Sequence, residues 1–292
     1  MGELIERVKN ILIGSLIGMV SILPGISGAV IAAIFGVYER MVDGLSDLKK
    51  NIKGDFWFLV TLGIGLIIGA VLFSFLYKKL VEPSEFYFVA IAMFIGMIAG
   101  QLPDVYRIAR SEGGSVKVSH MTWFALGFIS MMSILIFQIL YGIDEEAWDG
   151  TTNSIILMFI VGLIFSVGGL LPGFSAPTLL LAVGLFGMMT AVLSFSSFDL
   201  IMFLVFAAGI IVGILGFSKI MDTLIKRHHT VTYFAVLGLV SGSIFTIVDK
   251  LNADSTVNII LCVIAGVLGF AVSLGVSYIG KKQRSYAGVS RN

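Results

Sequence analysis

Long apolar stretches, separated by short polar or charged segments, recur along the whole chain. A helix that crosses a bilayer needs roughly 20 mainly apolar residues. Six stretches meet this requirement, and they cover residues 56–77, 86–102, 121–141, 200–218, 231–248 and 257–280. Continuous apolar runs favour a bundle of spanning helices over a β-barrel, whose strands alternate between apolar and polar residues. The pattern therefore predicts an all-α polytopic membrane protein.

Two further apolar regions, residues 11–42 and 154–194, are each interrupted by a Pro-Gly pair. The interruptions read "ILPGISGAV" at residues 22–30 and "LLPGFSAPT" at residues 170–178. The arm before the first pair would extend only about 20 Å as a helix, which is short of a bilayer core of roughly 30 Å. Each region is therefore predicted to be a re-entrant hairpin of two half-helices that meet at mid-depth. A broken helix that crosses the membrane once is the alternative.

The basic residues favour the re-entrant reading. If both hairpins are re-entrant, the side that holds both termini also holds 16 of the 19 basic residues: Arg7, Lys9, Arg40, Lys49, Lys50, Lys53, Arg107, Arg110, Lys117, Lys219, Lys226, Arg227, Lys281, Lys282, Arg284 and Arg291. The other side holds Lys78, Lys79 and Lys250, and its loop at residues 142–150 is acidic. Because basic loops stay in the cytoplasm, both termini are predicted to be cytoplasmic.

The two halves of the sequence also match each other. Residues of the first half recur in the second at offsets of 148, 144 and 142, in the pairs Pro24 and Pro172, Gly25 and Gly173, Ser27 and Ser175, Gly36 and Gly184, Gly65 and Gly209, Gly69 and Gly213, Gly96 and Gly238, and Gly100 and Gly242. Each half contains one hairpin and three spans. An odd number of crossings inverts the second half, so the sequence predicts an inverted-topology repeat.

The predicted repeats have defined boundaries. Repeat 1 covers about 11–141 and repeat 2 about 154–280, and segments 1–120 and 121–292 together form one membrane domain. The hairpins 11–42 and 154–194 open the two repeats.

The Pro-Gly breaks predict a polar site, because unpaired backbone groups in a bilayer core are costly. Pro24 ends the first arm, and Gly25 permits the chain to reverse. Ser27 and Ser175 then occupy the expected N-cap positions of the second arms, whose free N–H groups and dipoles favour an anion. A single Pro-Gly pair is more often a kink, but two matched pairs in inverted halves favour one anion site between facing tips.

Few charged residues are available for other roles. Only 13% of the residues are charged, and nothing in their distribution predicts a nucleic-acid partner. Cys262 is the only cysteine, so no disulfide framework or thiolate metal site is predicted, and no cofactor either. Glu39 and Arg40 follow the first hairpin, and they are predicted to be membrane-end anchors or a gating or coupling pair. Gln138 is predicted to bond to a neighbouring helix or to line the transport path. His228 lies in the predicted loop 219–230.

The segments "PGISGAVIAAIFGVYERM" and "PGFSAPTLLLAVGLFGMM" resemble the paired Pro-Gly-x-Ser-Gly signatures of the bacterial and archaeal polyprenyl-phosphate transporters of the PopT type, formerly a domain of unknown function. This resemblance implies a flippase in the cytoplasmic membrane. It would return undecaprenyl phosphate, or a similar polyprenyl phosphate, to the cytoplasmic leaflet for reuse in cell-wall synthesis. The implied partners are this lipid, membrane lipids and a coupling ion, proton or sodium, with the oligomeric state left open.

The resemblance carries over to specific residues at the two tips. The predicted phosphate site comprises Pro24, Gly25, Ile26, Ser27, Gly28, Gly173, Phe174, Ser175, Ala176 and Thr178, with Pro172 completing the second motif. The second copy departs from the signature after its serine. Ala176 and Pro177 therefore need not donate as their counterparts would, and the two tips are expected to contribute unequally.

Two other functions compete with lipid transport. A small-anion secondary transporter would use the same kind of mid-depth site. A membrane lipid-phosphate phosphatase would also combine hairpins with serines, but its chemistry needs acid–base groups and a phosphate-binding arginine near the nucleophile. Neither tip motif contains His, Asp, Glu, Arg or Lys, so the sequence predicts that the protein is not an enzyme. A purely structural scaffold leaves the duplicated helix breaks unexplained.

Overall fold

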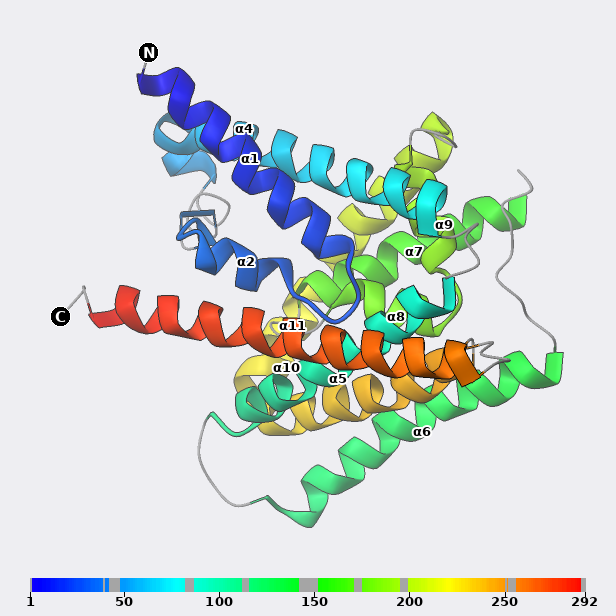
Figure 1. The fold of residues 1–292 in the computed structure, drawn as a ribbon. Helices are drawn as coiled ribbons and strands as arrows, with labels where there is room; N and C mark the ends of the chain where they lie inside the picture. Colours follow the sequence, from blue (N-terminus) through cyan, green and yellow to red (C-terminus); the bar gives the residue numbers. More distant parts are fainter. Residues whose placement is uncertain are drawn as a thin grey trace.

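The described part of the chain is helical. The computed structural model describes residues 2–38, 40–41, 48–81, 87–111, 116–141, 152–170, 175–194, 199–249, 251 and 256–289, and these contain no strand. Its helices, shown in Figure 1, are α1 (Gly2–Ile22), α2 (Gly28–Ile34), α4 (Leu48–Leu76), the π-helix η1 (Tyr77–Val81), α5 (Tyr87–Ala109), α6 (Val118–Tyr141), α7 (Thr152–Leu170), α8 (Ala176–Ala182), α9 (Phe186–Leu193), α10 (Leu200–Val248) and α11 (Thr256–Val289).

Among the described residues, six helical segments are long and apolar enough to cross a membrane, as the sequence pattern predicted. They are Phe56–Lys79, Tyr87–Ala109, Val118–Phe137, Leu200–Phe217, Arg227–Val248 and Thr256–Gly280. The chain is therefore a multi-pass membrane protein. The second span is longer than expected, because α5 continues through Pro103 to Ala109. A proline removes only one helical hydrogen bond, and neighbouring helices can compensate for it in a membrane protein.

The predicted loop at 219–230 is wrong: these residues are helical within α10. The helix departs from helical geometry only at His228 (φ −133°, ψ 38°). Thr232 Oγ1 donates to the carbonyl oxygens of Leu224 (3.2 Å) and His228 (2.9 Å). Residues eight positions apart lie about 12 Å apart along a straight helix, so α10 bends sharply here. No glycine or proline lies between 219 and 230 to end the helix earlier.

Glycines set how closely the helices approach one another. α1 packs against α4 where Gly14 meets Gly65, and α7 packs against α10 where Gly162 meets Gly209. Small residues at such crossings let membrane helices pack at backbone distance. The two halves also correspond in how their later helices pack. α5 lies along α11 and α6 lies along α10, with Gly96 against α11 and Gly238 against α6.

The crossing of α1 and α4 gives a stability prediction that compares two glycines of one helix. A Cβ at Gly65 would lie 2.9 Å from Gly14 Cα and against the Ile11 carbonyl oxygen, whereas a Cβ at Gly63 would meet nothing within 4 Å. We expect Gly65→Ala to destabilise the protein by about 1–3 kcal/mol. Gly63→Ala should be neutral or stabilising by about 1 kcal/mol. Unfolding temperatures in detergent test this, and equal shifts for the two variants would contradict the packing.

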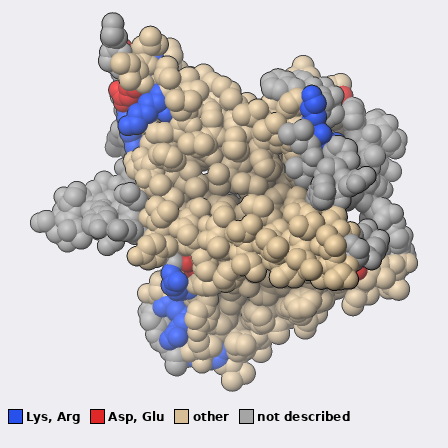
Figure 2. Space-filling view, in the orientation of Figure 1, with Lys and Arg blue, Asp and Glu red and all other residues tan. Residues whose placement is uncertain are grey.

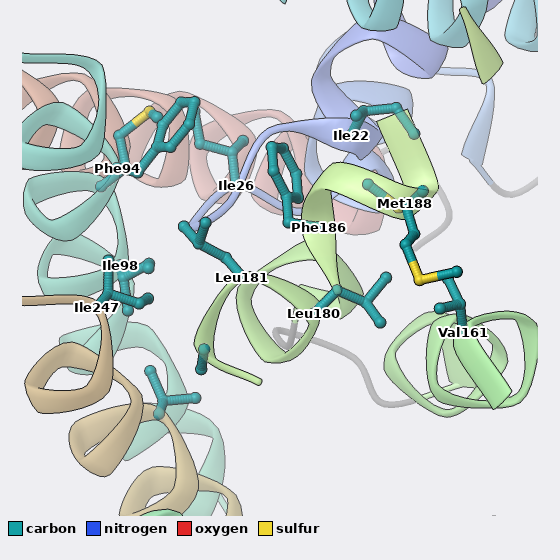
Figure 3. Packing of buried hydrophobic residues seen from close by; sticks show 14 of the residues in the cluster. Ile22, Ile26, Phe94, Ile98, Val161, Leu180, Leu181, Phe186, Met188 and Ile247 are labelled. Atoms are coloured by element: carbon teal, nitrogen blue, oxygen red, sulfur yellow. The ribbon is translucent and has the colours of Figure 1, made fainter. Parts of the chain in front are cut away.

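The buried core lies where the short helices meet the long ones. Figure 3 shows Ile26 of the first tip beside Phe186 of α9, with Leu181 of α8 below them and Ile98 of α5 to the left, and Ile22 of α1 lies beside Met188 of α9. Leu181 and Ile98 are fully buried. The interior between the long helices is therefore filled by the Pro-Gly regions of both halves.

The outer surface is apolar. Among the large exposed side chains are Ile67 of α4, Leu126 of α6, Leu215 of α10 and Val267 of α11. In Figure 2 the charged atoms lie toward the left and right sides of the molecule, and the broad surface between them carries none. This distribution fits a bilayer that surrounds the central part of the helices.

Candidate functional site

The first tip, residues 23–28, joins α1 to α2 by a tight reversal. α1 ends at Ile22, and the Leu23 N–H donates to the Val20 carbonyl oxygen at 3.0 Å. Gly25 has φ +80°, which residues with a side chain rarely adopt. A Cβ at this position would also run into the backbone of Met97 and Ile98 on α5. Gly25 is therefore required both by the turn and by the close approach to α5.

The second tip, residues 171–178, is described from Ser175 onward; the predicted site residues Pro172, Gly173 and Phe174 lie outside the described residues. Ser175 precedes α8, and Pro177 lies at the start of that helix. Ala176 packs against Gly168 of α7. Ser175, Ala176, Pro177 and Thr178 are all buried.

The two tips are hydrogen-bonded to each other. The Gly25 N–H donates to Thr178 Oγ1 at 3.0 Å. The Ser175 hydroxyl donates to the Leu23 carbonyl oxygen at 3.3 Å. These bonds join residues more than 150 positions apart in the sequence. The structure thus brings Leu23 and Gly25 of the first motif together with Ser175 and Thr178 of the second.

A third element, α11, supports the first tip. The Ser273 hydroxyl donates to the Gly25 carbonyl oxygen at 3.1 Å, and Ser273 is 4% exposed. The sequence analysis missed this residue. A serine within an otherwise apolar span was the available signal, but such serines commonly bond to their own helix, so it did not identify a partner.

The two serines stand at the helix starts where the sequence analysis placed them. Ser27 and Ser175 do occupy the N-cap positions of α2 and α8, but neither side chain caps its helix. Ser175 instead binds the first tip. Ser27 is partly buried, and Gly28 beside it lies close to the Ser21 hydroxyl of α1.

The helices that follow the two tips are short. α2 and α8 have seven residues each, and two residues after each helix comes a glycine with positive φ, Gly36 (+69°) and Gly184 (+80°). In both, the glycine N–H and the next N–H bond back to carbonyls of the last turn, which is the Schellman arrangement. Because helices of seven residues have small dipoles, the candidate site is defined by the hydrogen bonds at the two tips and not by the helix N-termini.

The predicted gating or coupling residues are not brought to the tips where the structure describes them. Arg40 forms an ion pair with Glu6 at 3.5 Å, and its guanidinium lies over the Phe58 ring at 4.1 Å from the centroid. These partners lie near the N-terminal ends of α1 and α4. Glu39 and the side chain of Gln138 lie outside the described residues.

The described tip contacts are made by neutral groups: backbone amides, carbonyls and the hydroxyls of Ser175, Thr178 and Ser273. Within the part of the chain that the structure describes, no group of three His, Cys, Asp or Glu residues is placed to hold a metal ion. The site thus offers neutral hydrogen-bond donors in a buried setting. Such groups can bind an anion by direct hydrogen bonds, which strengthen when the acceptor is charged.

Comparison with known proteins gives a consistent result. A polyprenyl-phosphate transporter of Vibrio cholerae is 25% identical over 261 residues, covering 83% of this chain and 78% of the relative. A polyprenyl-phosphate transporter of Staphylococcus aureus is 28% identical over 281 residues, covering 92% of this chain and 96% of the relative. No solved structure matches the chain. Residues 17–259 match the sequence model of one family, and the chain therefore belongs to the VCA0040-like family, described as undecaprenyl phosphate translocase-like.

Proposed function

We propose that this protein transports a polyprenyl phosphate, such as undecaprenyl phosphate, across the cytoplasmic membrane and binds the phosphate between the two tips. The observation that carries the proposal is the pair of hydrogen bonds that joins Gly25 to Thr178 and Ser175 to Leu23. When the tips separate, the Gly25 N–H and the Ser175 hydroxyl lose their protein acceptors. A phosphate can then accept both bonds, and charge-assisted bonds are the stronger ones.

The lipid tail needs no enclosed path in this mechanism. The surface between the charged ends of the molecule is apolar (Figure 2), so an isoprenoid chain can stay among the bilayer lipids while the head group enters between helices. A lipid phosphate therefore suits this site as a substrate. The related transporters of Vibrio cholerae and Staphylococcus aureus are also named for polyprenyl phosphate.

We propose that the halves form an inverted-topology repeat in which both hairpins are re-entrant. Matched glycines support this arrangement, since Gly36 and Gly184 share a positive φ. Figure 1 supports re-entry of the first hairpin, because α2 runs back toward the end of the molecule where α1 begins. Tips that enter from opposite sides allow access to alternate between the two leaflets around one fixed site.

The cytoplasmic side is assigned to the end that holds both termini. In Figure 1 the start of α1 and the last turns of α11 lie toward the left, and α5 ends and α6 starts toward the lower left. These segments carry or adjoin most of the basic residues. Under the positive-inside rule this end faces the cytoplasm, and the transport proposed here returns the carrier lipid toward it for reuse, with a proton or sodium gradient as the candidate driving force.

The proposal is tested by flipping of a fluorescent polyprenyl phosphate in proteoliposomes. We expect Ser175→Ala to slow flipping by at least about tenfold and the Ser27→Ala, Ser175→Ala double variant to slow it further, because hydrogen bonds to a charged acceptor contribute about 1.5–3 kcal/mol each. Ser133→Ala is the matched control, since the Ser133 hydroxyl is exposed and bonds to its own helix at Ile129 (2.8 Å). The control should flip at the native rate.

Other outcomes would replace the proposal. A folded native protein that flips no lipid under any imposed proton or sodium gradient would overturn it. Uptake of inorganic phosphate by the same proteoliposomes would then favour a small-anion transporter. Release of inorganic phosphate from the lipid would favour a phosphatase, although the described contacts of the tips include no acid–base side chain.

A further inference from the structure

Gln101 on α5 is a buried polar residue with an unused donor. It is 6% exposed, and its side-chain Nε2 is one of three buried side-chain nitrogen or oxygen atoms without a hydrogen-bond partner among the described residues. The other two belong to Ser74 on α4 and His229 beside the bend in α10. A buried amide donor without a partner is unfavourable, and each such group in a native structure calls for an explanation.

The position of Gln101 on α5 relates it to the first tip. The backbone of Gly25 rests against Met97 and Ile98, and Ser273, which binds the Gly25 carbonyl oxygen, lies next to Gly100. Side chains on a helix lean toward its N-terminal end, over the preceding turn. The Gln101 side chain therefore leans from α5 toward the turn on which Gly25 rests. Figure 3 shows this turn at Ile98, with Ile26 of the first tip nearby.

The position of the second half that corresponds to Gln101 shows that packing at this point does not require a side-chain amide. The offset of 142 that relates Gly96 to Gly238 and Gly100 to Gly242 relates Gln101 to Ser243. Ser243 is fully buried, and its hydroxyl donates to the Val240 carbonyl oxygen of its own helix at 2.8 Å. The second half thus has at this position a hydroxyl that bonds within its own helix. The first half has at this position a longer side chain, whose Nε2 has no partner among the described residues.

We infer that Gln101 is a further phosphate-binding residue, whose Nε2 donates a hydrogen bond to a phosphate oxygen when the tips part. This inference rests on the proposed function. A primary amide suits the task because it donates to an anion without carrying a charge into the bilayer core. The inference also assigns unequal roles to the two halves. The first half supplies the Gly25 N–H and the Gln101 amide as donors to the head group, whereas the second half supplies the Ser175 hydroxyl and, through Ser273, supports the Gly25 carbonyl oxygen.

The test measures binding of a short-chain polyprenyl phosphate, farnesyl phosphate, and of the uncharged alcohol farnesol to the full-length protein in detergent. In Gln101→Met, of similar shape but without a donor, we expect farnesyl phosphate to bind about 5- to 50-fold more weakly. Farnesol binding and the unfolding temperature should not fall, because Gln101 Nε2 has no hydrogen bond to lose within the part of the chain that the structure describes. Ser74→Ala, which removes another unpartnered buried group, is the control and should leave both affinities unchanged.

A second variant, Gln101→Glu, adds the pH dependence of flipping, which would not change if Gln101 had only a structural role. In Gln101→Glu the side chain donates only when protonated, and when ionised it repels the phosphate. Its flipping rate, relative to that of the native chain at each pH, should therefore rise as the pH falls.

The outcomes separate this inference from the proposed function. Native-like farnesyl phosphate affinity in Gln101→Met, in an experiment where Ser175→Ala lowers it, would overturn the role of Gln101 and leave the transporter proposal standing. Equal weakening of farnesyl phosphate and farnesol, with a lower unfolding temperature, would also overturn it, since this would be a packing effect. A native protein that neither binds farnesyl phosphate nor flips lipid would overturn both.

Discussion

Gly25→Ala is expected to abolish lipid flipping and to destabilise the protein by about 2–5 kcal/mol, from the strain of a side chain at positive φ and from overpacking. Gly25 has φ +80°, and a Cβ there would collide with the backbone of Met97 and Ile98. Backbone atoms of a packed helix cannot rotate away as a side chain can. The tip would have to move away from α5, and the hydrogen bonds of Gly25 to Thr178 and Ser273 would be lost with it.

Gly36→Ala is the matched control, because it introduces the strain of a side chain at positive φ without a collision between the new Cβ and a neighbouring helix. Gly36 also has a positive φ, +69°, but a Cβ there would meet nothing within 4 Å. This variant should lose only about 1–2 kcal/mol of stability and keep flipping lipid. Unfolding temperatures in detergent and flipping in proteoliposomes measure both effects. Flipping by Gly25→Ala at the rate of Gly36→Ala would show that the close packing of the first tip on α5 is not needed for transport.

Thr178→Val is the second change with a large expected effect. Thr178 is fully buried, and its hydroxyl oxygen accepts the hydrogen bond from the Gly25 N–H. Valine keeps the shape but leaves a buried N–H without an acceptor, which costs about 1–3 kcal/mol. The two tips would no longer be joined through Gly25. We expect a lower unfolding temperature and a loss of flipping of at least about tenfold, since 1.4 kcal/mol corresponds to a factor of ten.

Thr190→Val provides the control for the loss of a buried hydroxyl. Thr190 of α9 is also fully buried, but its hydroxyl bonds to carbonyls of its own helix, at Phe186 (3.2 Å) and Gly187 (3.0 Å). Those carbonyls retain their helical partners, so flipping should continue in this variant. Thr178→Ser should also flip lipid, because it keeps the acceptor. If Thr178→Val flips like the native chain, the bond between the tips has no part in transport.

The bonds between the tips are well suited to being exchanged during a transport cycle. They are made by neutral groups, and the net contribution of each such bond is about 0.5–1.5 kcal/mol. A phosphate that enters between Gly25 and Ser175 would replace them with charge-assisted bonds, which are roughly twice as strong. The tips can therefore hold together when no lipid is bound and separate without a large barrier when a phosphate arrives.

Several features were predictable because they depend on local sequence. The six crossing segments follow from the length and apolarity of the runs, since the bilayer sets both. The turn at Gly25 follows from the Pro-Gly pair. The correspondence between Gly36 and Gly184 in the sequence reappears as the same positive φ and the same helix end in both halves. Duplication, more than any single motif, made these residues recognisable.

Other features were not predictable because they depend on distant partners. Ser175 stands at the predicted N-cap position of α8, but its hydroxyl donates to the Leu23 carbonyl oxygen, 152 positions away. A cap is a contact within one helix, in which the serine oxygen accepts from a nearby N–H, whereas this bond depends on where the first tip lies. The bend at His228 was not predictable for a related reason. Thr232 stabilises it by a side-chain hydrogen bond to the Leu224 carbonyl oxygen, and no Pro or Gly in the sequence marks its position.

By itself, the sequence determined the crossing segments, the two helix breaks and their pairing, because apolar length, proline and glycine act on the chain locally. Only the tertiary structure decided which contacts the two helix breaks make. It placed Thr178 as the acceptor for Gly25, brought Ser273 from α11 to the first tip, and left Gln101 Nε2 buried without a partner among the described residues. Hydrogen bonds between side chains and a distant backbone depend on where helices cross, and the small residues that bring these helices together act only once the whole bundle has packed.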